Sequence, residues 1–143
     1  MDPDQIIAAL GLQAHPEGGW FAEIHRHAPP GGGRGAVTSI YYLLKAGERS
    51  HWHRIDADEI WHFHLGDALE MSLSADGRTQ QSCVLGADIG AGHRPQAIVP
   101  ARHWQAARSL GRFSLCGCTV APAFEFSGFE LAPKNWAPGR DQG

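Results

Sequence analysis

Short stretches of alternating apolar and polar residues, separated by glycine, proline and aspartate, make up most of the chain. β-branched and aromatic residues are enriched in these stretches, which favours strands over helices. The predicted strands cover residues 19–27, 36–44, 59–66, 69–73, 80–86, 96–100, 104–108 and 112–120. Many short strands with turn residues between them predict an all-β sandwich or barrel.

One short amphipathic helix is predicted ahead of the strands. Asp2 suits the N-cap, Pro3 suits the first helical position, and Gln5 can complete an arrangement like a capping box. Gly11 follows the apolar positions and predicts the end of the helix. Residues 1–14 therefore form the helix and the lead-in to the first strand.

The length of 143 residues predicts one domain spanning residues 1–143, large enough to bury a continuous core. Residues 28–35 are rich in proline and glycine, so we expect an exposed loop or a long hairpin connection there. Residues 137–143 are expected to form a frayed tail.

The composition limits the kinds of partner and the cellular compartment that we expect for this protein. A formal net charge of -3 provides no broad basic field for a phosphate backbone, so nucleic acid is not expected. No apolar run approaches the roughly 18 residues that suggest a membrane span. The first eleven residues lack the features of a signal peptide, and three cysteines cannot all pair within one chain, so we expect a cytoplasmic protein. Cys116 and Cys118 would share a strand face and are expected to be buried thiols without function.

The densest chemical signal lies in residues 50–66, which hold four of the nine histidines. His51 and His53 are two apart, so in an extended strand their imidazoles project from the same face, roughly 6.5 Å apart at the backbone. A carboxylate from the next strand would complete a three-ligand site for iron, manganese, zinc or nickel, with open positions for a substrate.

Two adjacent acids compete for that carboxylate. Asp58 and Glu59 must point to opposite faces of a regular strand. An inward Glu59 would bring Trp61 and Phe63 into the barrel and turn His62 outward, whereas an inward Asp58 would do the reverse. We favour Glu59.

The spacing of these residues resembles the first cupin motif, which is G, five residues, HxH, three or four residues, E, six residues, G. His51, His53, Glu59 and Gly66 stand at the matching positions. The sequence departs from the motif in two places, because five residues separate His53 from Glu59 and Gly47 lies three residues before His51.

The second cupin motif, G, five residues, PxGxxH, three residues, N, is matched less well by the segment that begins at Pro100. Arg102 replaces the glycine, Gln105 occupies the position of the fourth metal ligand, and Ser109 stands at the asparagine position. A neutral amide is a much weaker ligand than imidazole.

Over nearly the whole chain the segments HPEGGWF, TSIYYLL, SHWHRIDADEIWHFHLGD, VPARHWQAA and FSLCGCTVAPAFEFSGFELA resemble the cupin-5 family of jelly-roll proteins, which are related to dTDP-sugar epimerases. The resemblance implies a double-stranded β-helix, the cupin jelly-roll barrel, and a homodimer. It carries no established reaction.

Three functions are compatible with this pattern. The first is a metal-dependent oxygenase or isomerase in which one divalent ion is held by His51, His53, Glu59 and Gln105, with Gln105 or His103 contacting the substrate.

The second function is a metal-free epimerase or isomerase that uses histidine and carboxylate acid–base chemistry. Trp61 or Trp104 would stack on a ring, and Phe63 would line the pocket. Arg49, Arg54 and Arg102 could supply charge for a phosphate.

The third function is a small-ligand carrier or sensor without turnover. In each case Glu17 either accepts a ligand hydroxyl or caps a turn.

Overall fold

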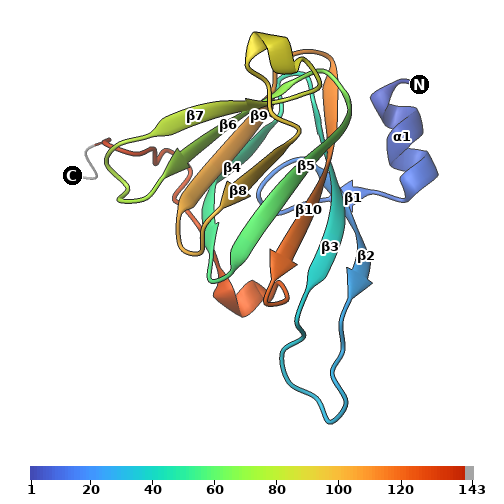
Figure 1. Ribbon diagram of the computed structural model, residues 1–143, viewed down its shortest axis with the longest axis vertical. Coiled ribbons are helices and arrows are strands. Elements are labelled where there is room, and N and C mark those ends of the chain that lie inside the picture. Colours follow the sequence, from blue (N-terminus) through green and yellow to red (C-terminus); the bar gives the residue numbers. More distant parts are fainter. Residues whose placement is uncertain (141–143) are drawn as a thin grey trace.

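The computed structural model describes residues 1–140, and these residues form two antiparallel sheets with one α-helix beside them (Figure 1). The elements are α1 (Pro3–Leu10), β1 (Gln13–Ala14), β2 (Trp20–Arg26), β3 (Thr38–Lys45), β4 (Arg49–Ile55), β5 (Asp58–Gly66), β6 (Leu69–Ser74), β7 (Gln81–Leu85), the 3-10 turn η1 (Ile89–Ala91), β8 (Gln96–Val99), β9 (Trp104–Ser109), β10 (Phe113–Ala121), the 3-10 turn η2 (Phe126–Gly128) and β11 (Phe129–Leu131).

The strand order identifies the fold. One sheet runs β1-β2-β3-β10-β5-β8 and the other runs β11-β4-β9-β6-β7. Strands distant in sequence lie side by side, since β10 pairs with both β3 and β5. The predicted all-β jelly-roll barrel with a short N-terminal helix is confirmed.

The N-terminal helix forms as its capping residues predict. The Asp2 carboxylate accepts from the Gln5 backbone N–H at 2.8 Å, and the Gln5 amide accepts from the Asp2 N–H at 2.9 Å. Gly11 ends the helix with a φ of 67°, a left-handed conformation that suits glycine. Ile6 buries the apolar side of the helix against Leu43 on the outer face of the first sheet.

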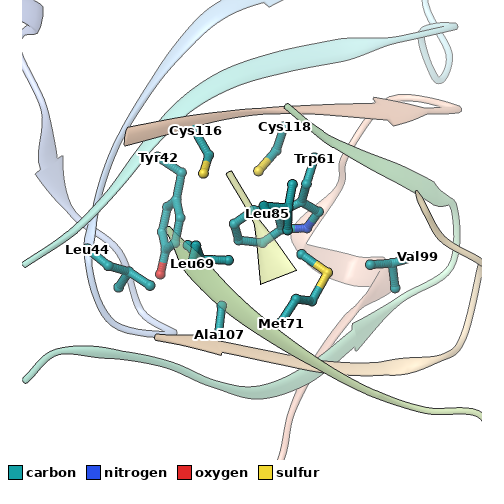
Figure 2. Close-up of a cluster of buried hydrophobic side chains, with 10 residues drawn as sticks. All are labelled: Tyr42, Leu44, Trp61, Leu69, Met71, Leu85, Val99, Ala107, Cys116 and Cys118. Carbon is teal, nitrogen blue, oxygen red and sulfur yellow. The ribbon is translucent and has the colours of Figure 1, made fainter. Parts of the chain in front are cut away.

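The main core lies between the two sheets (Figure 2). Its buried members are Tyr42, Leu44, Trp61, Leu69, Met71, Leu85, Val99, Ala107, Cys116 and Cys118. Both thiols are buried, as expected, and burial raises the pKa of Cys116 to about 12. At neutral pH these cysteines are therefore protonated packing residues.

Strand β5 turns Glu59 toward the barrel interior, as predicted. Glu59 is buried and Asp58 is exposed, with Trp61 inside the barrel and His62 outside, where its ring contacts Thr119. The pairing with β10 is regular from Asp58 onward and shifts only between Leu115 and Cys116, so no bulge disturbs the start of β5.

The long connection before β3 lies where the sequence predicts it, and part of the predicted tail is hydrogen-bonded to the rest of the chain. Residues 28–35 lie in the long connection between β2 and β3, which an ion pair of 2.7 Å between Arg34 and Asp56 holds in place. In the predicted tail, the Gly139 N–H donates to the Gly77 carbonyl at 3.0 Å, and residues 141–143 lie outside the described residues. Among residues 1–140 no helix is long and apolar enough to cross a membrane.

Candidate active site

Strand β4 contains a bulge, and this bulge determines which of its side chains face the barrel interior. Its pairing with β9 shifts between Ser50 and His53, and both of these side chains are buried. The His51 ring instead bonds through Nε2 to the Pro133 carbonyl at 3.0 Å, near the surface. The expectation that His51 and His53 project from the same face is therefore wrong, because an extra residue in a strand breaks the alternation of side chains.

A pocket lies at one end of the barrel, beside the inward-facing His53. Its cavity volume is about 60 Å³, which accommodates a few waters or a ligand of a few heavy atoms. Polar groups and aromatic rings share its wall. The lining residues are His15, Glu17, Phe21, Glu23, Arg26, Thr38, Ile40, His53, Ile55, Glu59, Val120, Phe124, Phe126 and Phe129.

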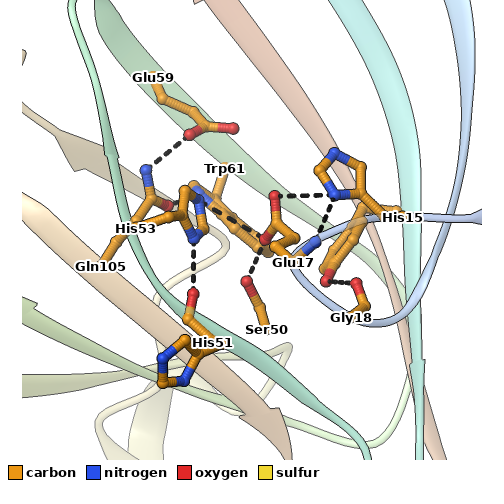
Figure 3. A network of polar contacts seen from close by, with 10 residues as sticks. His15, Glu17, Gly18, Ser50, His51, His53, Glu59, Trp61 and Gln105 are labelled. Atoms are coloured by element: carbon orange, nitrogen blue, oxygen red, sulfur yellow. Dashed lines mark hydrogen bonds and ion pairs between the residues drawn. The ribbon is translucent and has the colours of Figure 1, made fainter. Parts of the chain in front are cut away.

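His53 faces Glu17 inside this pocket (Figure 3). The Nδ1 atom of His53 lies 2.7 Å from the His51 carbonyl oxygen, to which it can only donate, so the neutral ring presents an unprotonated Nε2. This Nε2 lies 3.5 Å from Oε2 of Glu17. Glu17 also accepts a hydrogen bond from the Ser50 hydroxyl.

Burial controls the charge of this pair. The Glu17 side chain is 9% exposed, and desolvation raises its pKa to about 8. Desolvation also lowers the pKa of His53. Both shifts favour the uncharged forms, so at neutral pH a carboxylic acid faces a neutral imidazole.

His15 supports Glu17 from the other side. Its Nδ1 accepts the backbone N–H of Glu17 at 3.1 Å and lies 3.4 Å from Oε1 of the same residue. Burial, followed by the neighbouring His53, lowers the pKa of His15 to about 4, so its ring is neutral too. Its ring meets Phe21 edge-on, with 4.6 Å between the centroids.

Two glycines allow Glu17 to enter the barrel. A Cβ on Gly18 would lie 2.0 Å from the Arg49 carbonyl oxygen, and a Cβ on Gly19 would lie 2.7 Å from the Tyr42 hydroxyl oxygen. Both glycines also have positive φ, 108° and 76°. The Tyr42 hydroxyl donates to the Gly18 carbonyl and fixes the turn.

The second carboxyl of the pocket, Glu59, belongs to a buried chain of hydrogen bonds. The indole N–H of Trp61 donates to Oε1 of Gln105 at 3.0 Å, and Nε2 of Gln105 donates to Oε1 of Glu59 at 2.7 Å (Figure 3). Since an indole can only donate, Trp61 fixes which end of the amide faces Glu59. Burial raises the pKa of Glu59 to about 7.

The predicted metal ligands do not form one set. His51 points away from His53, and Gln105 presents N–H groups rather than its oxygen to Glu59. Within residues 1–140, no group of three or more histidine, cysteine, aspartate and glutamate side chains is placed to hold a metal ion. The geometry of this donor set does not fit a divalent cation.

The aromatic candidates and His103 lie outside the pocket. Trp61 is a core residue, and Phe63 packs against the core from β5. Trp104 is on the outer face of the second sheet, with the Arg54 guanidinium 4.4 Å from its ring centroid. His103 lies in the turn between β8 and β9.

The candidate phosphate-binding arginines also lie away from the pocket. Arg49 lines a groove on the outside of the barrel, and Arg54 is paired with Glu130. Arg102, which replaces the motif glycine, has a φ of 70°. Glycine, the residue at this position of the motif, adopts such a left-handed conformation without steric cost.

Sequence reasoning missed His15 and three of the four phenylalanines of the pocket. His15 lies two residues before Glu17, and that proximity is the signal that could have found it. Phe124, Phe126 and Phe129 come from the segment around η2, where no regular alternation marks an inward face.

The fold and this polar pocket at the barrel mouth define a cupin. The chain belongs to the family described as Cupin superfamily (DUF985), whose model matches residues 4–132.

Solved structures agree with this assignment. Protein SO0799 from Shewanella oneidensis is 38% identical, with a TM-score of 0.87 over 92% of this chain and 85% of that chain. A hypothetical protein from Leishmania major is 28% identical, with a TM-score of 0.83 over 92% of this chain and 88% of that chain.

Oxalate decarboxylase from Bacillus subtilis is 10% identical, with a TM-score of 0.62 over 82% of this chain and 29% of that chain, a likeness of fold alone. No curated protein matches the chain.

Proposed function

We propose that this cupin is a metal-free enzyme that moves a proton on a small carbonyl compound, as an epimerase or isomerase does. The observation that carries the proposal is the pair formed by His53 and Glu17, 3.5 Å apart in a pocket that Glu59 also lines. One imidazole and two carboxyl groups thus converge on one small ligand site.

The protonation states suit this chemistry. A general acid or base works best when its pKa lies near the working pH, and burial brings Glu17 to about 8 and Glu59 to about 7. The unprotonated Nε2 of His53 takes the proton from the carbon next to the carbonyl, and protonated Glu59 donates to the carbonyl oxygen. Delivery of a proton to the opposite face of the same carbon, with return of the enol proton to Glu59, gives the epimer. Delivery to the former carbonyl carbon, with loss of the neighbouring hydroxyl proton to Glu59, gives the isomer, and Glu17 exchanges protons with His53.

The wall of the pocket indicates the kind of substrate. Phe21, Phe124 and Phe129 exclude water from the polar groups, which strengthens their electrostatic effect on a bound carbonyl. Arg26, paired with Glu23 at 2.9 Å, is the lining residue that can meet an anionic group. We expect a hydroxy-carbonyl compound of a few heavy atoms.

The experiment follows proton exchange directly. The protein is incubated in heavy water with small aldoses, ketoses and hydroxy-ketones, and loss of the proton beside the carbonyl is measured by NMR. We expect exchange by the wild type, with a loss of at least about a hundredfold in Glu17→Gln and His53→Gln. His62→Gln, on the outer face, is the matched control and should exchange at the wild-type rate.

The same experiment separates the other two functions. A metal-dependent oxygenase or isomerase using iron, manganese, zinc or nickel would lose exchange on treatment with chelator and contain stoichiometric metal by elemental analysis. A carrier or sensor would bind one of these compounds in calorimetry and exchange no proton. Either result would overturn the proposed reaction.

A homodimer is part of the proposal. Strand β1 pairs only with Trp20 and Phe21, so residues 22–26 of β2 have one edge without a partner strand among residues 1–140. Ile24 on this strand is 52% exposed. Pairing with a second copy would cover both features. Light scattering should give twice the 15.5 kDa of one chain, and Ile24→Lys should shift the mass toward the monomer.

A further inference from the structure

A second concave site lies on the outside of the barrel, behind the β4 bulge. The groove crosses β4, β9 and β6 and has a volume of about 420 Å³, within the range of small-molecule sites. Trp52, Ser72 and Ala106 are among the residues that line it, and its charged and titratable residues are Arg49, His51, Glu70 and Arg108.

The charges in the groove are unbalanced. Arg49 and Arg108 stand directly opposite each other across β4 and β9, a cross-strand position in which like charges repel. Glu70 accepts from Nε of Arg108 at 2.9 Å, whereas the Arg49 side chain makes no hydrogen bond or ion pair within the described residues 1–140. An anion between the two guanidinium groups would relieve the repulsion and give Arg49 a partner.

We propose that this groove binds a small anion of the phosphate-monoester class. Two guanidinium groups on neighbouring strands can hold a phosphate through paired N–H donors, which is the geometry that arginine favours. Ser72 and Gln80 offer polar groups to the body of the ligand. Binding of the anion in this groove does not depend on the proposed reaction.

The groove and the inner pocket share backbone. Ser50 and His51 line the groove, while the Ser50 hydroxyl donates to Glu17 on the other side of the strand. The His51 N–H donates to the Glu17 carbonyl at 2.8 Å, and the His51 carbonyl accepts from Nδ1 of His53 at 2.7 Å. A ligand that shifts this peptide segment acts on both members of the proton-transfer pair, so the anion regulates the inner site.

Calorimetric titration with inorganic phosphate and with glycerol 3-phosphate tests the site. Arg49→Gln should weaken binding at least about tenfold, since a hydrogen-bonded charge is lost. Glu70→Gln should tighten binding a few-fold, because it removes an acid and frees Arg108 for the ligand. Arg112→Gln, an exposed arginine outside the groove, is the matched control.

Arg26→Gln distinguishes this groove from the inner pocket, whose rim holds Arg26. If Arg26→Gln removes phosphate binding and Arg49→Gln does not, the anion binds in the inner pocket and the proposal is wrong. Absence of binding by the wild type at low ionic strength, or equal binding by all the variants, overturns it as well.

The regulatory step has its own readout. Phosphate should move the imidazole NMR signals of His53 in the wild type and leave them unmoved in Arg49→Gln. Unmoved signals in a wild type that binds phosphate would overturn the coupling, whatever the inner pocket does to carbonyl compounds.

Discussion

Trp61 determines what Gln105 offers to the inner pocket, because the indole N–H occupies the amide oxygen at 3.0 Å. The amide nitrogen must then face Glu59, and it donates there at 2.7 Å. Trp61, a core residue, thus determines that Gln105 directs its N–H group toward Glu59. This orientation disfavours metal binding, because an amide N–H group has no lone pair for a cation.

Gln105→Leu should be strongly destabilising. The substitution leaves the Trp61 indole and a Glu59 oxygen without their hydrogen-bond partner in a buried position, and each unsatisfied group costs about 1–3 kcal/mol. Urea unfolding should show a loss of about 2–4 kcal/mol. The same change at the exposed Gln80 should cost under about 0.5 kcal/mol, and comparable losses at both positions would contradict the hydrogen-bond chain.

Glu59 should make stability fall as pH rises. Its pKa is about 7 in the folded protein against 4.5 as the ordinary value, so the folded state holds the proton more tightly. The contribution is fully present below about pH 4.5, declines as pH rises toward 7, and then levels off. Glu59→Gln removes this decline, so the variant should gain on the wild type between pH 4.5 and 8, by at most about 3 kcal/mol.

The measurement is urea unfolding of both proteins across this pH range. Glu130→Gln is the control for loss of a carboxylate outside the pocket, because this side chain is 57% exposed. A Glu59→Gln difference that is constant with pH would show that Glu59 does not carry a raised pKa.

Arg102→Gly should stabilise the protein. Arg102 adopts a φ of 70°, which costs a residue with a Cβ about 1–2 kcal/mol, and glycine removes that cost while adding unfolded-state entropy. The net gain should be about 0.5–1 kcal/mol in thermal or urea unfolding. Ala101→Gly, at the preceding position without positive φ, should not stabilise the protein, and a loss for Arg102→Gly would contradict the strain.

The three thiols should differ in reactivity. Burial raises the pKa of all three thiols, but Cys116 and Cys118 are buried whereas Cys83 is partly exposed. Native protein treated with a disulfide reagent at about pH 8 should release at most one equivalent, and unfolded protein should release three. Cys83→Ser should abolish the native reaction, and a remaining fast equivalent would place a second thiol at the surface.

Local signals were sufficient for much of the fold. The helix could be predicted because Asp2, Gln5 and Gly11 act within a few residues of one another, and β5 because Glu59 and Trp61 keep a strict alternation. These signals come from residues that are close together in the sequence.

The site was harder to predict because its geometry depends on distant partners. The bulge that separates His51 from His53 arises in the pairing with β9, and the His51 ring is held by Pro133. Phe124 and Phe129 reach the pocket from the C-terminal part of the chain. No local pattern encodes either relationship.

The turn at Gly18 and Gly19 places a limit on how this protein can vary. Neither position has a side chain, yet any Cβ there would collide with Arg49 or with Tyr42. A saturation-mutagenesis screen for a folded, working protein should therefore mark both glycines as intolerant, as strongly as Glu17 beside them. Two residues without functional groups would be as restricted as the acid whose place they secure.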